Sequence, residues 1–153
     1  MPQSLRGNYQ ADILRYEFCA LAVGLYEHLS GKPIEARGSF DDTDDINVQK
    51  LAGLGIVKGD GTGKFNPDGI FSREMAITLM YNMMIQLGYT FEDAVPDFAD
   101  ADAISPWAAE AIGALQKAGI IQGDGTNFKP KEDYTREMGI VTVMRFLETL
   151  TDS

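Results

Sequence analysis

The chain has 153 residues, enough for one domain with a real core, and its 44% hydrophobic and 24% charged residues are typical of a globular protein. A net charge of −10 with scattered basic residues argues against a nucleic-acid partner. No apolar run is long enough to span a membrane, and the first ten residues lack the pattern of a signal peptide.

The first predicted helix covers residues 14–29, where apolar side chains recur at helical spacing. This stripe consists of Phe18, Leu21, Leu25 and Leu29. Gly31 and Pro33 are typical of the end of a helix. The single cysteine, Cys19, excludes an internal disulfide, and its apolar setting predicts a buried thiol rather than a nucleophile.

Two short helices are predicted further along the chain. The first covers roughly residues 46–54, after a loop over residues 32–39. The second follows Ser105, which suits an N-cap, with Pro106 at the first helical position and Gly119 as the C-terminal stop. Its expected apolar face consists of Trp107, Ala111, Ile112 and Leu115.

Two further long helices are predicted after the hydroxyl N-caps Ser72 and Thr135, with Glu74 and Glu137 in their first turns. Their apolar stripes are Ala76, Leu79, Met80, Met83, Met84 and Leu87, and Ile140, Val143, Met144 and Leu147. Three long helices with such stripes are expected to pack on one another, with the shorter elements outside. The predicted fold is therefore all-α, a compact helical bundle with short extended pieces.

Residues 55–81 are repeated at residues 119–144. The matching pairs are Gly55/Gly119, Gly59/Gly123, Asp60/Asp124, Phe65/Phe128, Pro67/Pro130, Ser72/Thr135, Arg73/Arg136 and Met75/Met138. Agreement this dense identifies a repeat protein. The helix after Leu14 aligns with the other two long helices, with Arg15 at the position of their arginines. It looks like the second half of a first repeat whose opening half is missing.

These residues resemble the S-layer homology (SLH) family, whose repeat reads F-x-D, W-A, G-I-I-x-G, F-x-P and T-R-A-E. The last copy supplies Phe98, Asp100, Trp107-Ala108, Gly119-Ile120-Ile121, Gly123, Phe128, Pro130 and Thr135-Arg136-Glu137. The middle copy supplies Phe40, Asp42, Gly55-Ile56-Val57, Gly59, Phe65, Pro67 and Ser72-Arg73-Glu74. The predicted division is a single domain over 1–153, with a partial repeat at 9–33 and further repeats at 40–89 and 98–150.

The resemblance implies a pseudo-threefold bundle of helix–loop–helix repeats, the first of them truncated. It implies that the module anchors a bacterial surface protein non-covalently to the cell wall. The ligand would be secondary cell-wall polysaccharide, often carrying ketal-linked pyruvate, bound in grooves between repeats. The family is secreted, so we expect an extracellular location and a fragment that lacks its signal peptide. The resemblance implies neither a cofactor nor membrane insertion.

The expected ligand contacts come from the family motifs, with Arg73 and Arg136 as the principal ones. An arginine in the first turn of a helix combines guanidinium donors with exposed backbone N–H groups and the positive end of the helix dipole, which suits a sugar carboxylate. The other candidates are Arg15, Glu74, Glu137, Asp42, Asp100, Gly59, Gly123 and Trp107.

Each candidate also has a structural interpretation. Arg73 and Arg136 could pair with acidic side chains and tie the repeats together. Trp107 is the first residue of an apolar stripe, which favours burial in the core over a role as a platform on which a sugar ring stacks. Asp42 and Asp100 are expected to cap the following turn or helix. The alternative function is a structural or protein-interaction module that binds no glycan, in which a homodimer covers the surface left by the truncated first repeat.

Metal binding and catalysis have little support. Counting twelve positions from Asp60 or Asp124 gives Phe71 or Thr135, where a calcium loop needs glutamate. The glycine turns do not match a phosphate-binding loop. The only histidine, His28, has no nucleophile near it in the sequence and is expected to face solvent. We therefore expect no metal site and no enzyme activity.

Overall fold

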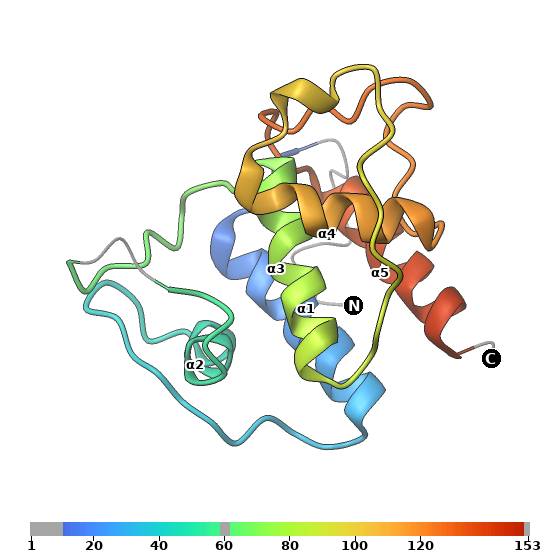
Figure 1. Ribbon diagram of the computed structural model, residues 1–153. Helices are drawn as coiled ribbons and strands as arrows, with labels where there is room; N and C mark the ends of the chain where they lie inside the picture. Colours follow the sequence, from blue (N-terminus) through green and yellow to red (C-terminus); the bar gives the residue numbers. More distant parts are fainter. Residues whose placement is uncertain (1–10, 59–61, 152–153) are drawn as a thin grey trace.

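The computed structural model describes residues 11–58 and 62–151 (Figure 1). Its helices are α1 (Arg15–Ser30), α2 (Ile46–Gly53), α3 (Arg73–Gln86), the 3-10 helix η2 (Ala101–Ala103), α4 (Pro106–Lys117) and α5 (Arg136–Thr151). Isolated β-bridges join some loops, and the described residues form no sheet. The all-α prediction is confirmed. None of the described helices is long and apolar enough to cross a membrane.

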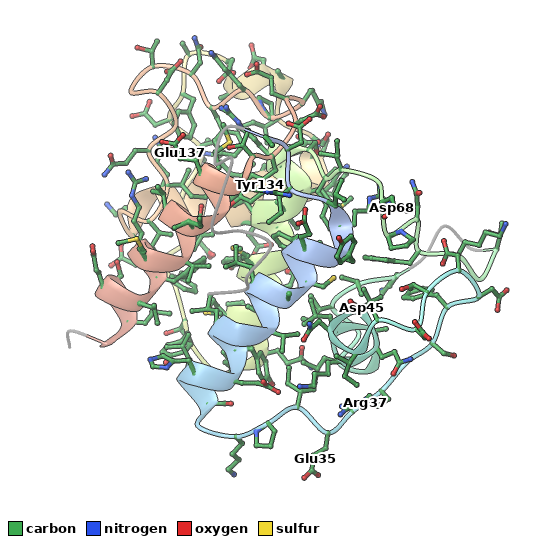
Figure 2. All side chains as sticks on the ribbon, turned by 180° about the vertical axis from the view of Figure 1, so that it is seen from behind. Glu35, Arg37, Asp45, Asp68, Tyr134 and Glu137 are labelled. Carbon is green, nitrogen blue, oxygen red and sulfur yellow. The ribbon has the colours of Figure 1, made fainter. Side chains whose placement is uncertain are left out.

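The three long helices lie at the centre and the two short helices lie outside them. Helix α1 contacts both α3 and α5, α2 packs on α1, and α4 packs across α3 (Figure 1). From behind, α1 runs between α5 and α2 (Figure 2). Each short helix thus covers the long helix of the repeat before it. Phe18, Met80 and Phe146, one from each long helix, are fully buried in the core.

The long helices begin where the sequence predicted. Ser72 Oγ accepts a hydrogen bond from the Met75 N–H (3.4 Å), and Thr135 Oγ1 accepts one from the Met138 N–H (3.2 Å). Such hydroxyl caps satisfy backbone donors that have no partner inside the helix. At the other end of α1, Gly31 adopts the left-handed conformation that closes a helix.

The predicted stripes of α1 and α3 are buried except at their last residues, Leu29 and Leu87, which are half-buried, whereas that of α5 is partly wrong. Thr142 and Phe146 are buried on α5, but Met144 is exposed. The reason is positional: the face of α5 that carries Met144 is not the face that packs against α1. Cys19 is buried, which raises the pKa of its thiol, and His28 is exposed, as predicted for both.

Candidate functional site

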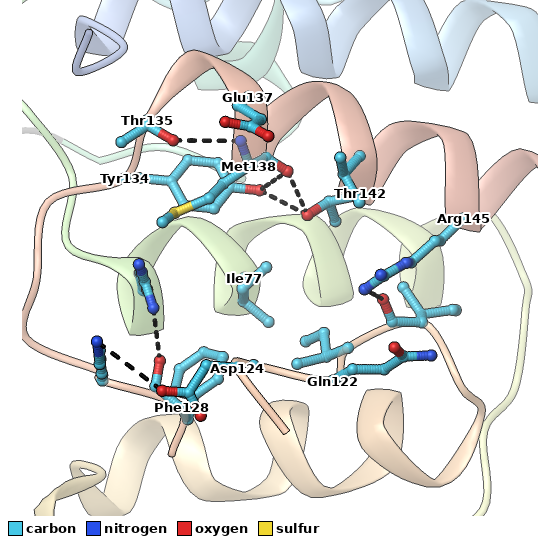
Figure 3. A pocket seen from close by; sticks show the side chains of 16 residues that line it. Ile77, Gln122, Asp124, Phe128, Tyr134, Thr135, Glu137, Met138, Thr142 and Arg145 are labelled. Atoms are coloured by element: carbon cyan, nitrogen blue, oxygen red, sulfur yellow. Dashed lines mark hydrogen bonds and ion pairs between the residues drawn. The ribbon is translucent and has the colours of Figure 1, made fainter. Parts of the chain in front are cut away.

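A groove of about 370 Å³ opens between α3, α5 and the loop over residues 120–129 (Figure 3). This volume lies at the small end of the range of roughly 300–1,000 Å³ that is typical of ligand pockets. Ile77 projects from α3 into the space between α5 and the loop. The groove therefore lies between the second and third repeats, with an apolar floor.

Five charged side chains line the groove, and they come from three separate elements. They are Arg73, Asp124, Lys129, Glu137 and Arg145. Three cations against two acids give the groove a positive balance in a chain whose net charge is −10. Lys129 Nζ lies 3.8 Å from Asp124, and both side chains are substantially exposed, so the pair is loose.

The loop wall of the groove is held in shape by its own backbone. Gly123 has φ +60°, and a methyl group there would clash with the Asn127 carbonyl oxygen. Asp124 Oδ1 accepts the N–H groups of Asn127 (2.6 Å) and Thr126 (2.9 Å). Those two donors hold the pKa of Asp124 below its ordinary value. The turn is thus preorganised, with its carboxylate ionised at neutral pH.

The wall beside α5 is formed by a buried tyrosine. The Tyr134 hydroxyl donates to Thr142 Oγ1 (2.8 Å), whose own hydroxyl donates to the Met138 carbonyl (2.7 Å). Burial raises the pKa of Tyr134, so the phenol stays neutral. This chain of bonds fixes a surface against which a ligand can pack.

Arg73 is the only one of the three repeat arginines that lines this groove. Its Nη1 donates to the Phe128 carbonyl (3.1 Å), and Arg15 Nη1 donates in the same way to the Phe65 carbonyl (3.2 Å). The guanidinium of Arg15 also stacks over the Phe71 ring at 4.8 Å. Each arginine therefore holds the F-x-P loop of the following repeat.

Arg136 is engaged differently from the other two arginines. Its Nη2 donates to both carboxylate oxygens of Glu17, at 3.3 Å and 3.0 Å. Glu17 is buried on α1 and accepts the Leu14 N–H as well (3.0 Å). The ion pair joins the third repeat to the first, which is the tying role that the sequence left open.

The backbone N–H groups at the starts of α1 and α3 are not available to a ligand, which corrects the expectation that they are exposed. The N–H groups of Arg15 and Arg73 donate to the carbonyls of Gly69 (2.8 Å) and Glu132 (2.9 Å). Arg136 N–H donates to a carbonyl too, that of residue 11. Loops of the neighbouring repeat thus already satisfy these helix N-termini.

Asp42 and Asp100 hold the F-x-P loop of their own repeat instead of capping the following turn or helix. Asp42 accepts the N–H groups of Phe65 (2.9 Å) and Asn66 (2.8 Å). Asp100 accepts the N–H groups of Phe128 and Lys129, both at 2.8 Å. The expectation of local caps was wrong because the partners lie more than twenty residues further along the chain.

The Asp42 clamp predicts a pH dependence of stability. The Phe65 and Asn66 N–H groups hold the pKa of Asp42 below its ordinary value. The unfolded chain therefore binds the proton more readily, so this stabilisation is present above the unfolded pKa of about 3.9 and is lost as pH falls through the folded pKa. In urea unfolding, the stability gap between wild type and Asp42→Asn should narrow below pH ~4. A gap that is constant with pH would contradict this prediction.

The chain matches a known family over two stretches. The S-layer homology domain family matches residues 39–76 and 97–137, together more than half of the chain. The chain belongs to the S-layer homology domain family. The matched stretches begin next to Phe40 and Phe98, the first residues of the two F-x-D motifs, and end in α3 and α5.

Several characterised proteins resemble this SLH chain over most of its length. Exoglucanase XynX of Acetivibrio thermocellus is 30% identical over 80% of the chain. S-layer protein sap of Bacillus anthracis is 38% identical over 64%, and an amylopullulanase of Thermoanaerobacterium thermosulfurigenes is 32% identical over 68%. The chain spans only 12%, 12% and 5% of these three proteins.

The SLH groove brings together three of the residues predicted from the motifs. Arg73, Gly123 and Glu137 line it. Arg15, Arg136, Asp42 and Asp100 make the contacts between or within repeats described above. Gly59 lies outside the described residues.

Glu74 and Trp107 lie at the junction of α3 and α4, away from the groove lining. Glu74 is buried and accepts the Ser105 N–H (2.9 Å), the Ser105 hydroxyl (2.6 Å) and Lys131 Nζ (2.8 Å). Burial alone would raise the pKa of Glu74, but these hydrogen bonds outweigh it and lower the pKa. Ser105 stands at the N-cap, but its hydroxyl serves Glu74 instead of α4. Trp107 is 52% exposed, so its expected place in the core is wrong.

Arg145 and Tyr134 line the groove but were missed from the sequence. A signal for Arg145 existed, because Glu137, Val141 and Arg145 follow one another at four-residue spacing and share one face of α5. The sequence around Arg145 does not indicate that this face borders a groove. Tyr134 precedes the T-R motif and carries no distinguishing signal.

Proposed function

We propose that this SLH module anchors a bacterial surface protein to the cell wall by binding secondary cell-wall polysaccharide in the groove between α3 and α5. The observation that carries the proposal is the positive balance of the groove within a strongly acidic chain. A local cluster of cations over an apolar floor suits a sugar polymer with an anionic substituent, such as a pyruvate ketal.

Arg73 is the proposed principal contact. Its Nη1 donates to the Phe128 carbonyl, and its side chain lines the groove at the start of α3, where a ligand carboxylate would meet a positive charge. Arg145 and Lys129 flank the groove and add charge, and Asp124 and Glu137 can accept hydrogen bonds from sugar hydroxyls.

Arg136 is a weaker choice than the motif suggested, because Glu17 already engages its guanidinium. Trp107 presents an exposed indole on α4, and we propose it as a platform on which a sugar ring of the same polymer stacks.

The proposed location is the cell surface. We propose no catalytic role for this chain, because the relatives that share its sequence are named for unrelated activities: one is an S-layer protein and two are different enzymes.

Co-sedimentation with purified wall sacculi tests this function. Wild type should sediment with intact sacculi and remain soluble after their secondary polymer has been extracted. An Arg145→Ala/Lys129→Ala double variant should bind about tenfold more weakly or worse, because two cations leave the groove while the fold keeps its main contacts. The matched control is Lys32→Ala/Lys117→Ala, which removes two exposed cations outside the groove.

Binding that survives polymer extraction, or that falls equally in both double variants, would contradict the proposal. The first result would point to another wall component. The second would point to attraction through overall charge, which carries no site information and is screened by salt. Absence of binding to the walls of the source organism would favour the structural or interaction role.

A further inference from the structure

Two cations lie at one end of the groove between α3 and α5. Arg73 Nη1 donates to the Phe128 carbonyl (3.1 Å), and Lys129 follows Phe128 in the loop. Both cationic side chains line the groove. Asp124 lies at the same end, 3.8 Å from Lys129 Nζ (Figure 3). This end therefore presents two cations with one carboxylate beside them.

A third cation lies at the opposite end of the groove. Arg145 stands eight residues after Glu137, which places it about 12 Å further along α5. Its Nη1 donates to the Ile120 carbonyl. In Figure 3, Arg145 and Asp124 lie at opposite ends, and Ile77 of α3 lies between them. The distance along α5 is greater than the length of one sugar ring, so one small anion does not reach both ends.

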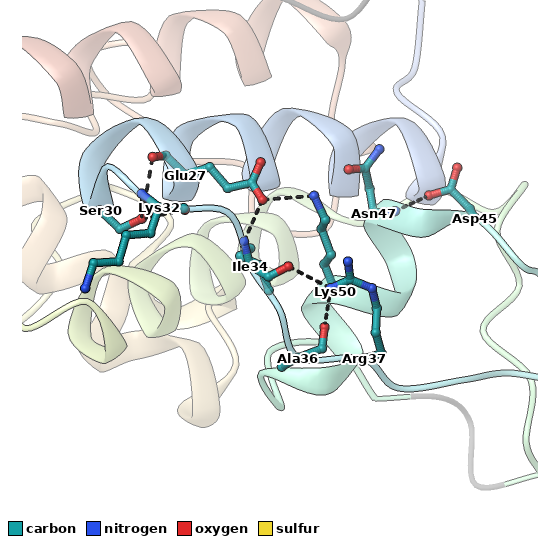
Figure 4. Close-up of polar contacts among 9 residues, drawn as sticks. All are labelled: Glu27, Ser30, Lys32, Ile34, Ala36, Arg37, Asp45, Asn47 and Lys50. Atoms are coloured by element: carbon teal, nitrogen blue, oxygen red, sulfur yellow. Dashed lines mark hydrogen bonds and ion pairs between the residues drawn. The ribbon is translucent and has the colours of Figure 1, made fainter.

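Cations that serve the fold of this chain are held at short distances. Lys50 Nζ of α2 lies 2.9 Å from the Glu27 carboxylate of α1, which also accepts the Ile34 N–H at 2.7 Å (Figure 4). Arg37 Nη1 donates to the carbonyls of Ile34 (2.7 Å) and Ala36 (2.8 Å). These lengths are those of ordinary, well-formed hydrogen bonds.

The cations at 129 and 145 are held much more loosely. Arg145 Nη1 lies 3.4 Å from its carbonyl partner, and Lys129 Nζ lies 3.8 Å from Asp124. Glu148 is one turn from Arg145 on α5, yet within the described part of the chain no ion pair joins the two. Contacts this long contribute little to stability, so both charges remain available to an external anion.

The second repeat shows that its fold does not need these cations. At the spacing that aligns the two F-x-P loops, Lys129 matches Asn66 and Arg145 matches Asn82. Lys129 has φ +59° and Asn66 has φ +61°. Asparagine adopts this left-handed conformation more readily than lysine does. The fold is therefore served at least as well by asparagine at residue 129, and strained backbone of this kind is typical of functional sites.

We propose that Arg145 binds a second carboxylate of the same polymer chain whose first carboxylate meets Arg73 and Lys129. The bound segment is then an internal stretch of a polymer with an acidic substituent on successive repeating units, not a single charged sugar at a chain end. The apolar floor at Ile77 packs against the sugar between the two charges. This inference rests on the anchoring function proposed above and specifies the class of polymer.

Fragments of the wall polymer with one or two carboxylates test the inference. Partial hydrolysis of the purified secondary polymer releases them, and anion exchange separates them by charge. In isothermal titration calorimetry, the two-carboxylate fragment should bind wild type about tenfold more tightly than the one-carboxylate fragment. Arg145→Asn should remove this gain and bind the two fragments alike. Lys129→Asn should weaken both fragments, because both carry the first carboxylate.

Two controls separate charge from folding and from length. Both variants introduce the residue that the second repeat has, and Lys129→Asn should melt no lower than wild type, since asparagine suits its φ. Lys117→Ala removes an exposed cation outside the groove and should bind both fragments as wild type does. After reduction of the carboxylates to alcohols, the longer fragment should lose its advantage.

Three results overturn the inference. The first is equal affinity of wild type for the two fragments. The second is an equal loss for both fragments in Arg145→Asn, which would make Arg145 a support of the groove wall. The third is an advantage of the longer fragment that survives carboxylate reduction, which would assign the gain to contacts with sugar rings. The anchoring function itself would still stand in all three cases. If neither the fragments nor the intact polymer bind wild type, the anchoring function fails and this inference fails with it.

Discussion

Replacing Arg136 with alanine is expected to lower the free energy of unfolding by about 3 kcal/mol, because it leaves a buried carboxylate without its cation. Glu17 is 2% exposed and its two oxygens receive Arg136 Nη2 at 3.3 Å and 3.0 Å. The ion pair joins α5 to α1, two helices that are far apart in the sequence. Urea denaturation monitored by circular dichroism measures the loss.

The same substitution at the matching position of the second repeat provides the comparison. Arg73 donates to a neutral backbone carbonyl, so Arg73→Ala should cost about 1 kcal/mol. In a Glu17→Gln/Arg136→Ala double variant the buried charge is gone, and part of the lost stability should return. If Arg136→Ala unfolds at the wild-type urea concentration but no longer sediments with sacculi, Arg136 is a ligand contact, as its motif predicted.

The fold could be predicted because the sequence features that specify it are either local, such as a helix cap, or present in two copies. Helix starts depend on a single hydroxyl such as Ser72 or Thr135, and two aligned copies indicated the helix order. Contacts between repeats could not be predicted in this way. The partner of Arg136 lies 119 residues away, and the partner of Asp42 lies 23 residues away.

Exposure was the least predictable property, and the two errors share a cause. Trp107 and Met144 both extend apolar stripes, and both are exposed. An apolar stripe indicates which residues of a helix could be buried. How many of them are buried depends on the element that packs against the helix. Tyr81 on α3 packs against the Phe91 ring of the segment that follows, whereas Met144, at the matching position of α5, is 53% exposed among the described residues.

The candidate site was predictable only in part for the same reason. Motifs indicated Arg73, Gly123 and Glu137, which the groove brings together from α3, the loop and α5. The motif could not distinguish Arg73 from Arg136, since both follow a hydroxyl cap. They differ because α1 offers a buried Glu17 to the third repeat, a residue that has no acidic counterpart at Met75 and Met138 in the other repeats.

Gly113→Ala is expected to cost about 3 kcal/mol, the upper end of what overpacking a core position costs. The segment before the third repeat crosses α4 at Gly113, and a methyl group there would clash with the carbonyl oxygen of Ala94. Backbone has to move to relieve such a clash. Gln116 anchors that segment by bonding both the N–H (2.7 Å) and the carbonyl (3.0 Å) of Asp97, so the movement also strains this bond pair.

Gly24→Ala makes the same chemical change in α1 with the opposite expected sign. A methyl group on Gly24 meets nothing within 4 Å, so the variant should be more stable by about 1 kcal/mol through helix propensity alone. Thermal unfolding of both variants beside wild type measures the difference. Equal stabilisation by the two substitutions would show that the crossing segment does not press on α4. If only Gly113→Ala loses stability, the close packing of the segment before the third repeat on α4 stabilises that repeat. The groove would depend on the same packing, since α4 leads directly into its loop wall.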